Sequence, residues 1–291
     1  MSSENKDFLS PNSINNTCQQ ENFLSEFLQE TLAMTKRLFI QLWRRPSSLI
    51  AGIVQPFMWL ILFGALFHNA PEGIFENNIN YAKFLSPGII IFTAFSGSLN
   101  AGLPIMFDRE FGFLNRLLVA PLSSRYSIVA SSTLYIVSLS LIQTGVIIIA
   151  SSILGAGIPN IFDLVAIILV ILLTVCGVTG LSLGLAFALP GHIELIAVIF
   201  VTNLPLLFAS TALAPLSFMA KWLQIIASLN PLTYAIEFIR YIYLYGNLSM
   251  NSIIFRNPFI EINGVETLLL LLGFDLLVLF SIQPLLRRRF N

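Results

Sequence analysis

Residues 107–124 read FDREFGFLNRLLVAPLSS and separate two apolar stretches, each long enough to cross a membrane. Asp108 is a residue type that caps helix N-termini, and Glu110 would lie in the first turn of such a helix. Arg116 suits the negative end of the helix dipole, and Pro121 is a typical stop. One face of this helix would be apolar and would carry Phe111, Leu114, Leu117, Leu118 and Leu122. We therefore expect a short amphipathic helix that lies on a membrane surface or contacts a partner.

The composition is typical of a membrane protein rather than a soluble domain. The chain has 291 residues, of which 56% are hydrophobic and only 10% are charged. A bilayer core requires about 20 apolar residues per helical span, and the apolar residues here occur in long runs rather than in alternation. The sequence therefore predicts an all-α polytopic membrane protein with six transmembrane helices. These helices are expected at about 47–68, 85–107, 126–154, 164–189, 193–214 and 264–286.

Positive charges are divided unequally between the two sides that this arrangement defines. An even number of spans puts both termini on one side, together with residues 107–124. The Lys and Arg residues on that side are Lys6, Lys36, Arg37, Arg44, Arg45, Arg109, Arg116, Arg125 and Arg287 to Arg289. Those on the other side are Lys83, Lys221, Arg240 and Arg256. The positive-inside rule therefore places the termini in the cytoplasm or its topological equivalent.

The N-terminal region divides into two parts before the first span. Residues 1–22 are rich in Asn, Ser and Gln and lack an apolar core, which predicts a disordered tail rather than a signal peptide. Residues 23–44 carry apolar side chains at helical spacing with charges between them. We expect an amphipathic helix on the cytoplasmic leaflet, which is either a specific structural element or a generic basic anchor.

The longest stretch between spans, residues 215–263, contains the signals of a second helical insertion. Asn230-Pro231 is typical of an N-cap followed by the first helical residue. We expect a broken pair of helices, 216–228 and 231–245, that enters the outer leaflet. Glu237 and Arg240 are three residues apart and could pair.

Several polar residues occur inside the predicted spans. Those that could line a transport pathway are Gln55, Asn100, Gln143, Asn203 and the ionisable Asp275. The uncharged members of this set could equally make hydrogen bonds between helices. The sequence does not decide between these roles.

The sequence carries no pattern that indicates catalysis, a metal or a cofactor. It has no nucleophile with a nearby base, no paired carboxylates and no Cys or His cluster with ligand spacing. The two cysteines, Cys18 and Cys176, lie in the polar tail and inside a span, so they are not expected to pair. A phosphate-binding loop of the Gly-x-x-x-x-Gly-Lys-Ser/Thr type is absent as well. We expect a protein that is not an enzyme and has no nucleic-acid partner.

Two motifs support a family resemblance that covers residues 23–289. The first is REFGFLNRLLVAPLS at 109–123, and the second is LNPLTYAIEFIR at 229–240. In order and in predicted side of the membrane they resemble the integral membrane subunit of ABC-2 type transporters, of the daunorubicin-resistance-like kind. The chain is also similar to the members found in cyanobacteria and encoded in algal plastids.

The resemblance implies the permease half of an ATP-driven exporter. Two copies would enclose the pathway, and each would dock on a separate subunit that binds ATP. The region Asp108–Leu122 would be the coupling helix that contacts this ATPase, and 23–44 the connecting helix beside it. The coupling residues carried over are Asp108, Arg109, Glu110, Phe111, Leu114, Arg116, Leu117, Leu118 and Pro121. The expected location is a plastid membrane, either thylakoid or inner envelope, or a bacterial or cyanobacterial plasma membrane.

Two other functions remain open at this stage. An ion-coupled secondary transporter or channel would depend on an intramembrane carboxylate, for which Asp275 is the candidate. A membrane subunit of the cytochrome c maturation type would be expected to use histidines as haem ligands. The only histidines are His68 and His192, predicted on opposite sides of the membrane.

Overall fold

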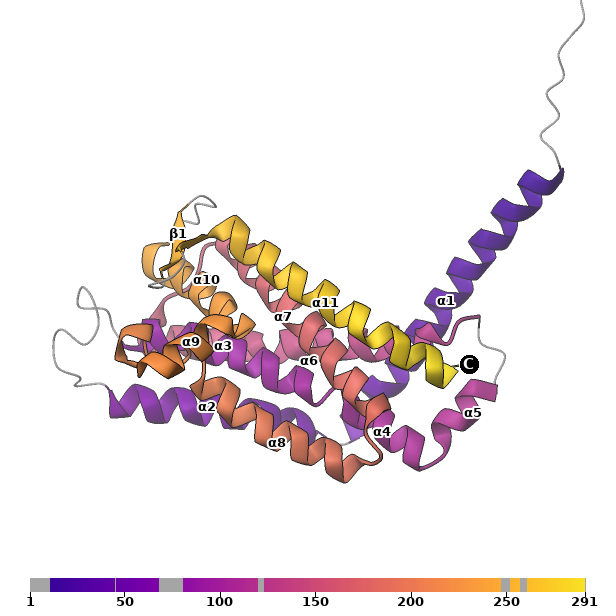
Figure 1. Cartoon of the computed structure of the whole chain (residues 1–291), viewed down its shortest axis with the longest axis horizontal. Helices are drawn as coiled ribbons and strands as arrows, with labels where there is room; N and C mark the ends of the chain where they lie inside the picture. The colour runs from indigo at the N-terminus through magenta and orange to yellow at the C-terminus, as the bar shows by residue number, and fades with distance from the viewer. Residues whose placement is uncertain are drawn as a thin grey trace, which may run out of the picture.

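The computed structural model shows an all-α membrane protein, as the sequence predicts (Figure 1). It describes residues 11–44, 46–67, 81–119, 123–246, 252–256 and 261–290. The α-helices are α1 (Pro11–Arg44), α2 (Ser47–Leu66), α3 (Tyr81–Leu99), α4 (Gly102–Glu110), α5 (Phe113–Val119), α6 (Tyr126–Ser151), α7 (Ile161–Ala188), α8 (His192–Phe208), α9 (Lys221–Leu229), α10 (Pro231–Tyr245) and α11 (Gly264–Phe290). The shorter elements are the π-helix η2 (Ser152–Ala156), the 3-10 helix η3 (Leu216–Phe218) and an antiparallel pair of strands, β1 (Ile253–Arg256) and β2 (Glu261–Asn263).

Helix α1 begins twelve residues before the predicted amphipathic helix. The predicted disordered tail, 1–22, is therefore helical from Pro11 onward, and its first ten residues lie outside the described part of the chain. Proline is favoured in the first turn of a helix, and no further proline or glycine occurs before Pro46. The exposed side chains of α1 include the apolar Leu24, Leu28 and Leu32 together with polar ones such as Glu26 and Lys36, a mixture that suits an amphipathic helix on a leaflet.

Within the described residues, five helical stretches are long and apolar enough to cross a membrane, one fewer than the six predicted. They are Leu49–Leu66, Tyr81–Glu110, Tyr126–Ala156, Ile161–Ala188 and Gly264–Pro284. The sixth predicted span, 193–214, is helical only as α8, which has 17 residues. At 1.5 Å per residue, α8 is about 25 Å long, which is shorter than the bilayer core of about 30 Å.

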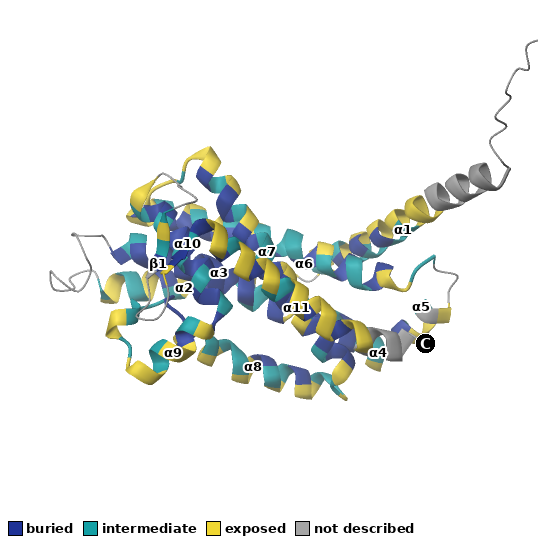
Figure 2. Cartoon of the chain, turned by 45° about the horizontal axis from the view of Figure 1, so that its top comes forward, coloured by how far each residue is buried: buried dark blue, intermediate teal, exposed yellow. Residues whose placement is uncertain are grey.

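Helix α3 forms the centre of the bundle. It packs against α2, α6, α7 and α10, and nearly all of its residues are buried. Figure 2 shows the buried residues concentrated along α3 and α10, whereas α8, α9 and α11 carry many exposed ones. Helix α11 lies along α7, where Gly180 and Gly184 leave room for Val278 and Ile282. These small residues therefore permit close helix packing.

The turn between α3 and α4 interrupts a helix inside the bundle. Ser182 of α7 bridges this interruption, since its hydroxyl donates to the carbonyl of Leu99 at 2.5 Å and accepts the N–H of Gly102 at 2.9 Å. Gly102 lies against the backbone of Ser182, where a Cβ atom would be 2.5 Å from the carbonyl oxygen. A side chain on a neighbouring helix thus satisfies the backbone groups that the turn leaves unpaired.

The non-helical backbone that follows α8 is satisfied in the same way. Asn230 donates to the carbonyls of Leu206 and Ala209, at 3.1 and 2.8 Å. Arg240 donates to the carbonyl of Thr211 at 2.5 Å and is itself buried. Non-helical backbone inside a membrane protein requires such partners. These contacts explain why the predicted sixth span can end early without exposing polar backbone to lipid.

The predicted broken pair of helices is confirmed as α9 and α10, although the first helix begins at Lys221 rather than at 216. The Asn230 side chain accepts the N–H of Leu232 at 3.0 Å, and Pro231 is the first residue of α10. The predicted pairing of Glu237 with Arg240 is also confirmed. The guanidinium of Arg240 lies 3.8 Å above the centre of the Phe84 ring, so this charge also fixes α10 to α3. The hairpin of β1 and β2 was not predicted.

Replacing Gly88 with alanine should destabilise the bundle. A Cβ atom at Gly88 would lie 2.3 Å from the carbonyl oxygen of Ala212 and 2.7 Å from its Cα, so backbone would have to move. Overpacking of this kind costs roughly 1–3 kcal/mol. The matched control is Gly64→Ala in α2, because no atom lies within 4 Å of the Cβ position there. Thermal unfolding in one detergent should show a lower Tm for Gly88→Ala only, and equal Tm values would contradict the packing described.

Candidate functional site

The predicted coupling helix is two short helices rather than one. Asp108 does not cap a helix N-terminus, which corrects the prediction, because it lies in the last turn of α4. Gly112 follows with a φ of 73°, a left-handed conformation that suits glycine, and α5 begins at Phe113. Leu118 belongs to α5, but its side chain is not among those described, and Pro121 and Leu122 lie outside the described residues. The apolar spacing continues across Gly112 and hides this break.

Asp108 joins α4 to α1. Its two carboxylate oxygens accept hydrogen bonds from the Arg37 guanidinium at 2.8 and 3.1 Å, a bidentate arrangement. The same guanidinium lies 3.9 Å from the centre of the Phe113 ring. Arg37 therefore holds the end of α4 and the start of α5 at once.

Arg109 joins α4 to the end of α7. It donates to the carbonyls of Ala186 at 2.9 Å, Leu189 at 2.6 Å and Pro190 at 2.6 Å. These carbonyls belong to or follow the last turn of α7, where they have no partner within the helix and where the helix dipole favours a cation.

Glu110 joins α4 to the start of α8. One carboxylate oxygen accepts the backbone N–H of His192 at 2.6 Å, and the other lies 2.5 Å from Nδ1 of the His192 ring. A carboxylate at a helix N-terminus is favoured by the dipole. Successive residues of a helix point about 100° apart, so the charged triplet Asp108–Glu110 contacts three different helices.

A further contact fixes the chain that returns from α5 to α6. Glu30 of α1 accepts the backbone N–H of Ser123 at 2.7 Å. Desolvation acts to raise the pKa of Glu30, but the hydrogen bonds from Ser123 and its neighbours outweigh it and hold this pKa below its ordinary value. Helix α1 therefore contacts both the last turn of α4 and the chain that follows α5.

Helix α5 has one buried and one exposed side. Leu114 is buried and Leu117 packs beside it, in a small cluster. That cluster also contains Ile105, Ile128, Leu183, Phe187, Val278 and Ile282, which come from the adjoining ends of α4, α6, α7 and α11. Phe111 and Val119 are 80% and 87% exposed, and Arg116 is exposed as well. The segment thus presents apolar side chains and a cation at the end of the bundle where α5 lies in Figure 1.

Three of the predicted pathway residues meet in one cavity. Gln55 of α2, Asn100 at the end of α3 and Gln143 of α6 line a cavity of about 420 Å³, which we call the amide cavity. Asn203 of α8 is one contact away, since it donates to the hydroxyl of Ser96, another lining residue, at 3.4 Å. Packing therefore brings together four residues that the sequence singled out separately, and their transport role stays a prediction.

The fifth predicted residue, Asp275, lies apart from this cavity. Its carboxylate is against α7, where a Cβ atom on Gly177 would be 2.2 Å from Oδ1. This oxygen is buried and has no hydrogen-bond partner among the described residues. The described residues also contain no group of three or more His, Cys, Asp or Glu side chains that could hold a metal.

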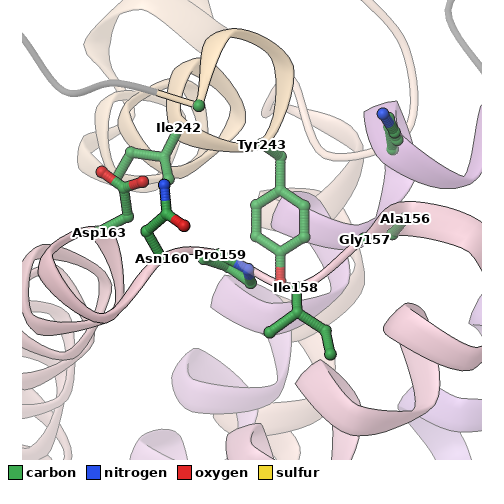
Figure 3. Close-up of a pocket in the computed structure, with 10 residues that line it drawn as sticks. Ala156, Gly157, Ile158, Pro159, Asn160, Asp163, Ile242 and Tyr243 are labelled. Atoms are coloured by element: carbon green, nitrogen blue, oxygen red, sulfur yellow. The ribbon is translucent and has the colours of Figure 1, made fainter.

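A smaller pocket of about 150 Å³ lies at the opposite end of the bundle from α5. Asn160 and Asp163 line one side of it, and in Figure 3 the phenol oxygen of Tyr243 points toward Ile158 and Pro159. It adjoins the turn between η2 and α7. Asp163 was not singled out in the sequence, because no local pattern distinguishes it.

The fold and these contacts define a class of protein. Several long apolar helices, an amphipathic helix α1 and a charged surface segment between two spans are features of a polytopic membrane transport protein. The model of the ABC-2 type transporter family matches residues 29–244, which is most of the chain. The chain therefore belongs to the ABC-2 type transporter family, as the resemblance predicted.

The similar proteins are consistent with this family. The chain is 53% identical to the transport permease named ycf38 of Porphyra purpurea over 266 residues, which is 91% of each chain. It is also 53% identical to the protein of that name from Cyanophora paradoxa over 264 residues, again 91% of each. A doxorubicin resistance ABC transporter permease protein, DrrC, of Mycobacterium tuberculosis is 27% identical over 227 residues, which is 74% of this chain and 76% of DrrC.

Replacing Arg109 with methionine should loosen the junction of α7 and α8. Methionine keeps much of the side chain's length but cannot donate to the carbonyls of Ala186, Leu189 and Pro190. Loss of charge-assisted hydrogen bonds should speed amide hydrogen exchange in residues 186–195 by roughly tenfold or more. The control is Arg116→Met, an exposed arginine of α5. Unchanged exchange in Arg109→Met would show that these bonds do not hold the junction.

Proposed function

We propose that this chain is the membrane-spanning subunit of an ATP-driven ABC exporter and docks through α4 and α5 on a separate ATPase subunit. The observation that carries the proposal is the contrast within this segment. Its base is fixed to α1, α7 and α8 by the charged triplet, whereas Phe111, Arg116 and Val119 are exposed. Aromatic and Arg side chains are the residue types that dominate binding at protein interfaces.

The contacts of the charged triplet also suit the transmission of movement. A rigid lever is required if closure of an ATPase dimer is to reach the membrane helices. A push on α5 is passed to α4, and from there directly to α1, α7 and α8, because each has its own polar contact with Asp108, Arg109 or Glu110. The buried Leu114 would transmit the same movement to the ends of α6, α7 and α11, because it packs against their residues.

A homodimer forms the second part of the proposal. Helix α2 is the least buried of the five long apolar stretches, since only 11% of the stretch Leu49–Leu66 is buried within the chain. One side of the amide cavity is formed by this helix. A second copy packed along α2 would cover this face and complete the pathway.

The proposed membrane and the proposed direction of transport are supported by the relatives rather than by the geometry of the structure. The ycf38 relatives support a plastid membrane or a cyanobacterial membrane as the location. Export is supported by the name of DrrC, since a transporter that confers resistance to a drug acts by removing the drug from the cell. Nucleotide would be bound by the ATPase subunit.

The experiment that tests this proposal is capture of the tagged full chain from its native membrane in mild detergent. Mass spectrometry of the captured proteins should find an ATPase with a phosphate-binding loop at a stoichiometric amount. A known ABC transporter from the same membrane serves as the positive control. If that complex survives and this chain brings down no ATPase, the proposal is wrong.

Replacing Phe111 with glutamate should weaken capture of the ATPase. An exposed aromatic anchor typically contributes about 2 kcal/mol or more to an interface, so binding should fall at least roughly tenfold. Phe162→Glu is the matched control, because Phe162 is 89% exposed but lies at the other end of the bundle, where α7 begins. Both variants should reach the membrane at the level of the unaltered chain. Equal capture by the two variants would exclude α4–α5 as the docking segment.

A further inference from the structure

The amide cavity and its immediate surroundings contain buried polar atoms that no described residue satisfies. Gln143 is 3% exposed, and its Oε1 atom has no hydrogen-bond partner among the described residues. The Ser140 hydroxyl and the Asn203 Oδ1 atom, which lie beside the cavity rather than in its lining, are also buried and have no partner among the described residues. Buried polar groups are nearly always hydrogen-bonded, so three such atoms in one neighbourhood indicate that something else binds there.

Two glycines create the space around these atoms. A Cβ atom on Gly52 would lie 2.2 Å from Nε2 of Gln143, and one on Gly97 would lie 3.1 Å from its Oε1. The Gly97 position is also 3.3 Å from the Ser140 hydroxyl. The Gln143 amide therefore sits between α2 and α3, and the unpaired atoms of Gln143 and Ser140 face the same point.

The chemistry of the lining selects an uncharged ligand with hydroxyl groups. The described lining residues carry no charge, and their polar groups are the amides of Gln55, Asn100 and Gln143 with the hydroxyls of Ser96 and Tyr135. An ion without an opposite charge in such a site would lose its hydration at high cost. A hydroxyl both donates and accepts, so it can satisfy either atom of an amide.

The rest of the cavity is apolar and the cavity is partly open. Leu103, Ile136 and Leu139 line it, and Gln55 and Asn100 at its edge are exposed. Its volume of about 420 Å³ falls within the range of roughly 300–1,000 Å³ that is usual for small-molecule sites. A ligand with a polar head and an attached apolar part matches this division.

We propose that the amide cavity binds the uncharged, hydroxyl-bearing head group of an amphiphile taken from the bilayer, with a hexosyl head group as the representative chemistry. This names the substrate class of the permease function proposed above and rests on that function. Leu103 and Pro104 line the cavity and belong to α4, the helix that carries the charged triplet. Occupancy of the cavity and contact with the ATPase therefore act on the same helix.

The test measures which lipids remain bound to the full complex. The permease with its captured ATPase is placed in nanodiscs that contain equal amounts of a hexosyl diacylglycerol and a phosphatidylglycerol with the same acyl chains. After transfer to mild detergent, native mass spectrometry should find the hexosyl lipid enriched about fivefold or more. Equal retention of the two lipids would overturn the proposal.

Two variants and a matched control assign any enrichment to this cavity. Gln143→Leu removes the amide and should return the two lipids to equal retention, and Gly97→Ala should reduce enrichment because its methyl group fills the space beside Gln143 and Ser140. Gln283→Leu, at an exposed position of α11, should keep full enrichment. If both cavity variants keep the enrichment, or if Gln283→Leu abolishes it, the site assignment is wrong.

Two further measurements separate this proposal from binding of soluble sugars and from failure of the exporter function. A large excess of free hexose should not displace the lipid, and displacement would show that the site takes soluble sugars rather than an amphiphile. The same spectra report the ATPase subunit. If the chain captures no ATPase from its native membrane, the exporter function is refuted, and the same retention measurement on the permease alone still tests the lipid site. Bound ATPase without enrichment would refute the lipid site but not the exporter function.

Discussion

The structure depends on one constraint of the bilayer, which is that no backbone polar group can be left without a partner. At three of the breaks in the described part of the bundle, a side chain from another element supplies the missing hydrogen bonds. Ser182 bridges the turn between α3 and α4, Arg109 binds the carbonyls at the end of α7, and Asn230 and Arg240 bind those that follow α8. Without these contacts the bundle would require uninterrupted helices, and neither the α4–α5 segment nor the short α8 could be accommodated.

Features that depend on neighbouring residues were predictable from the sequence. Length and hydropathy place most of the spans, because a bilayer of fixed thickness imposes the length of an apolar run. The cap at Asn230-Pro231 and the pairing of Glu237 with Arg240 follow from spacing along one helix, and both were found. The polar residues of the amide cavity could be singled out one at a time, because each interrupts an apolar run. Their meeting in one cavity follows from the packing of α2, α3 and α6, which no single segment encodes.

Two of the errors, at Asp108 and at the sixth span, come from contacts between distant parts of the chain, and the other two come from local signals that were misread. Asp108 is a residue type preferred at helix N-caps. Its partner Arg37 lies 71 residues away, and this contact overrides the local preference for a cap. The tail was predicted to be disordered because it lacks apolar residues, yet nothing in its sequence stops a helix that begins at Pro11. The end of the sixth predicted span at Phe208 depends on Asn230 and Arg240, which belong to a later part of the chain. A signal for the break in the coupling segment was present in Gly112, and the regular apolar spacing on both sides concealed it.

Helix α4 is nine residues long, and its two ends serve different surroundings. Leu103 and Pro104 form part of a cavity wall, and Asp108, Arg109 and Glu110 hold the segment that faces outward. A rigid helix cannot change position at one end alone, so under the functions proposed above binding at either end would be coupled to binding at the other. Such coupling is reciprocal by thermodynamic necessity. If a ligand in the cavity strengthens attachment of a partner to α5 by some factor, that partner must strengthen binding of the ligand by the same factor.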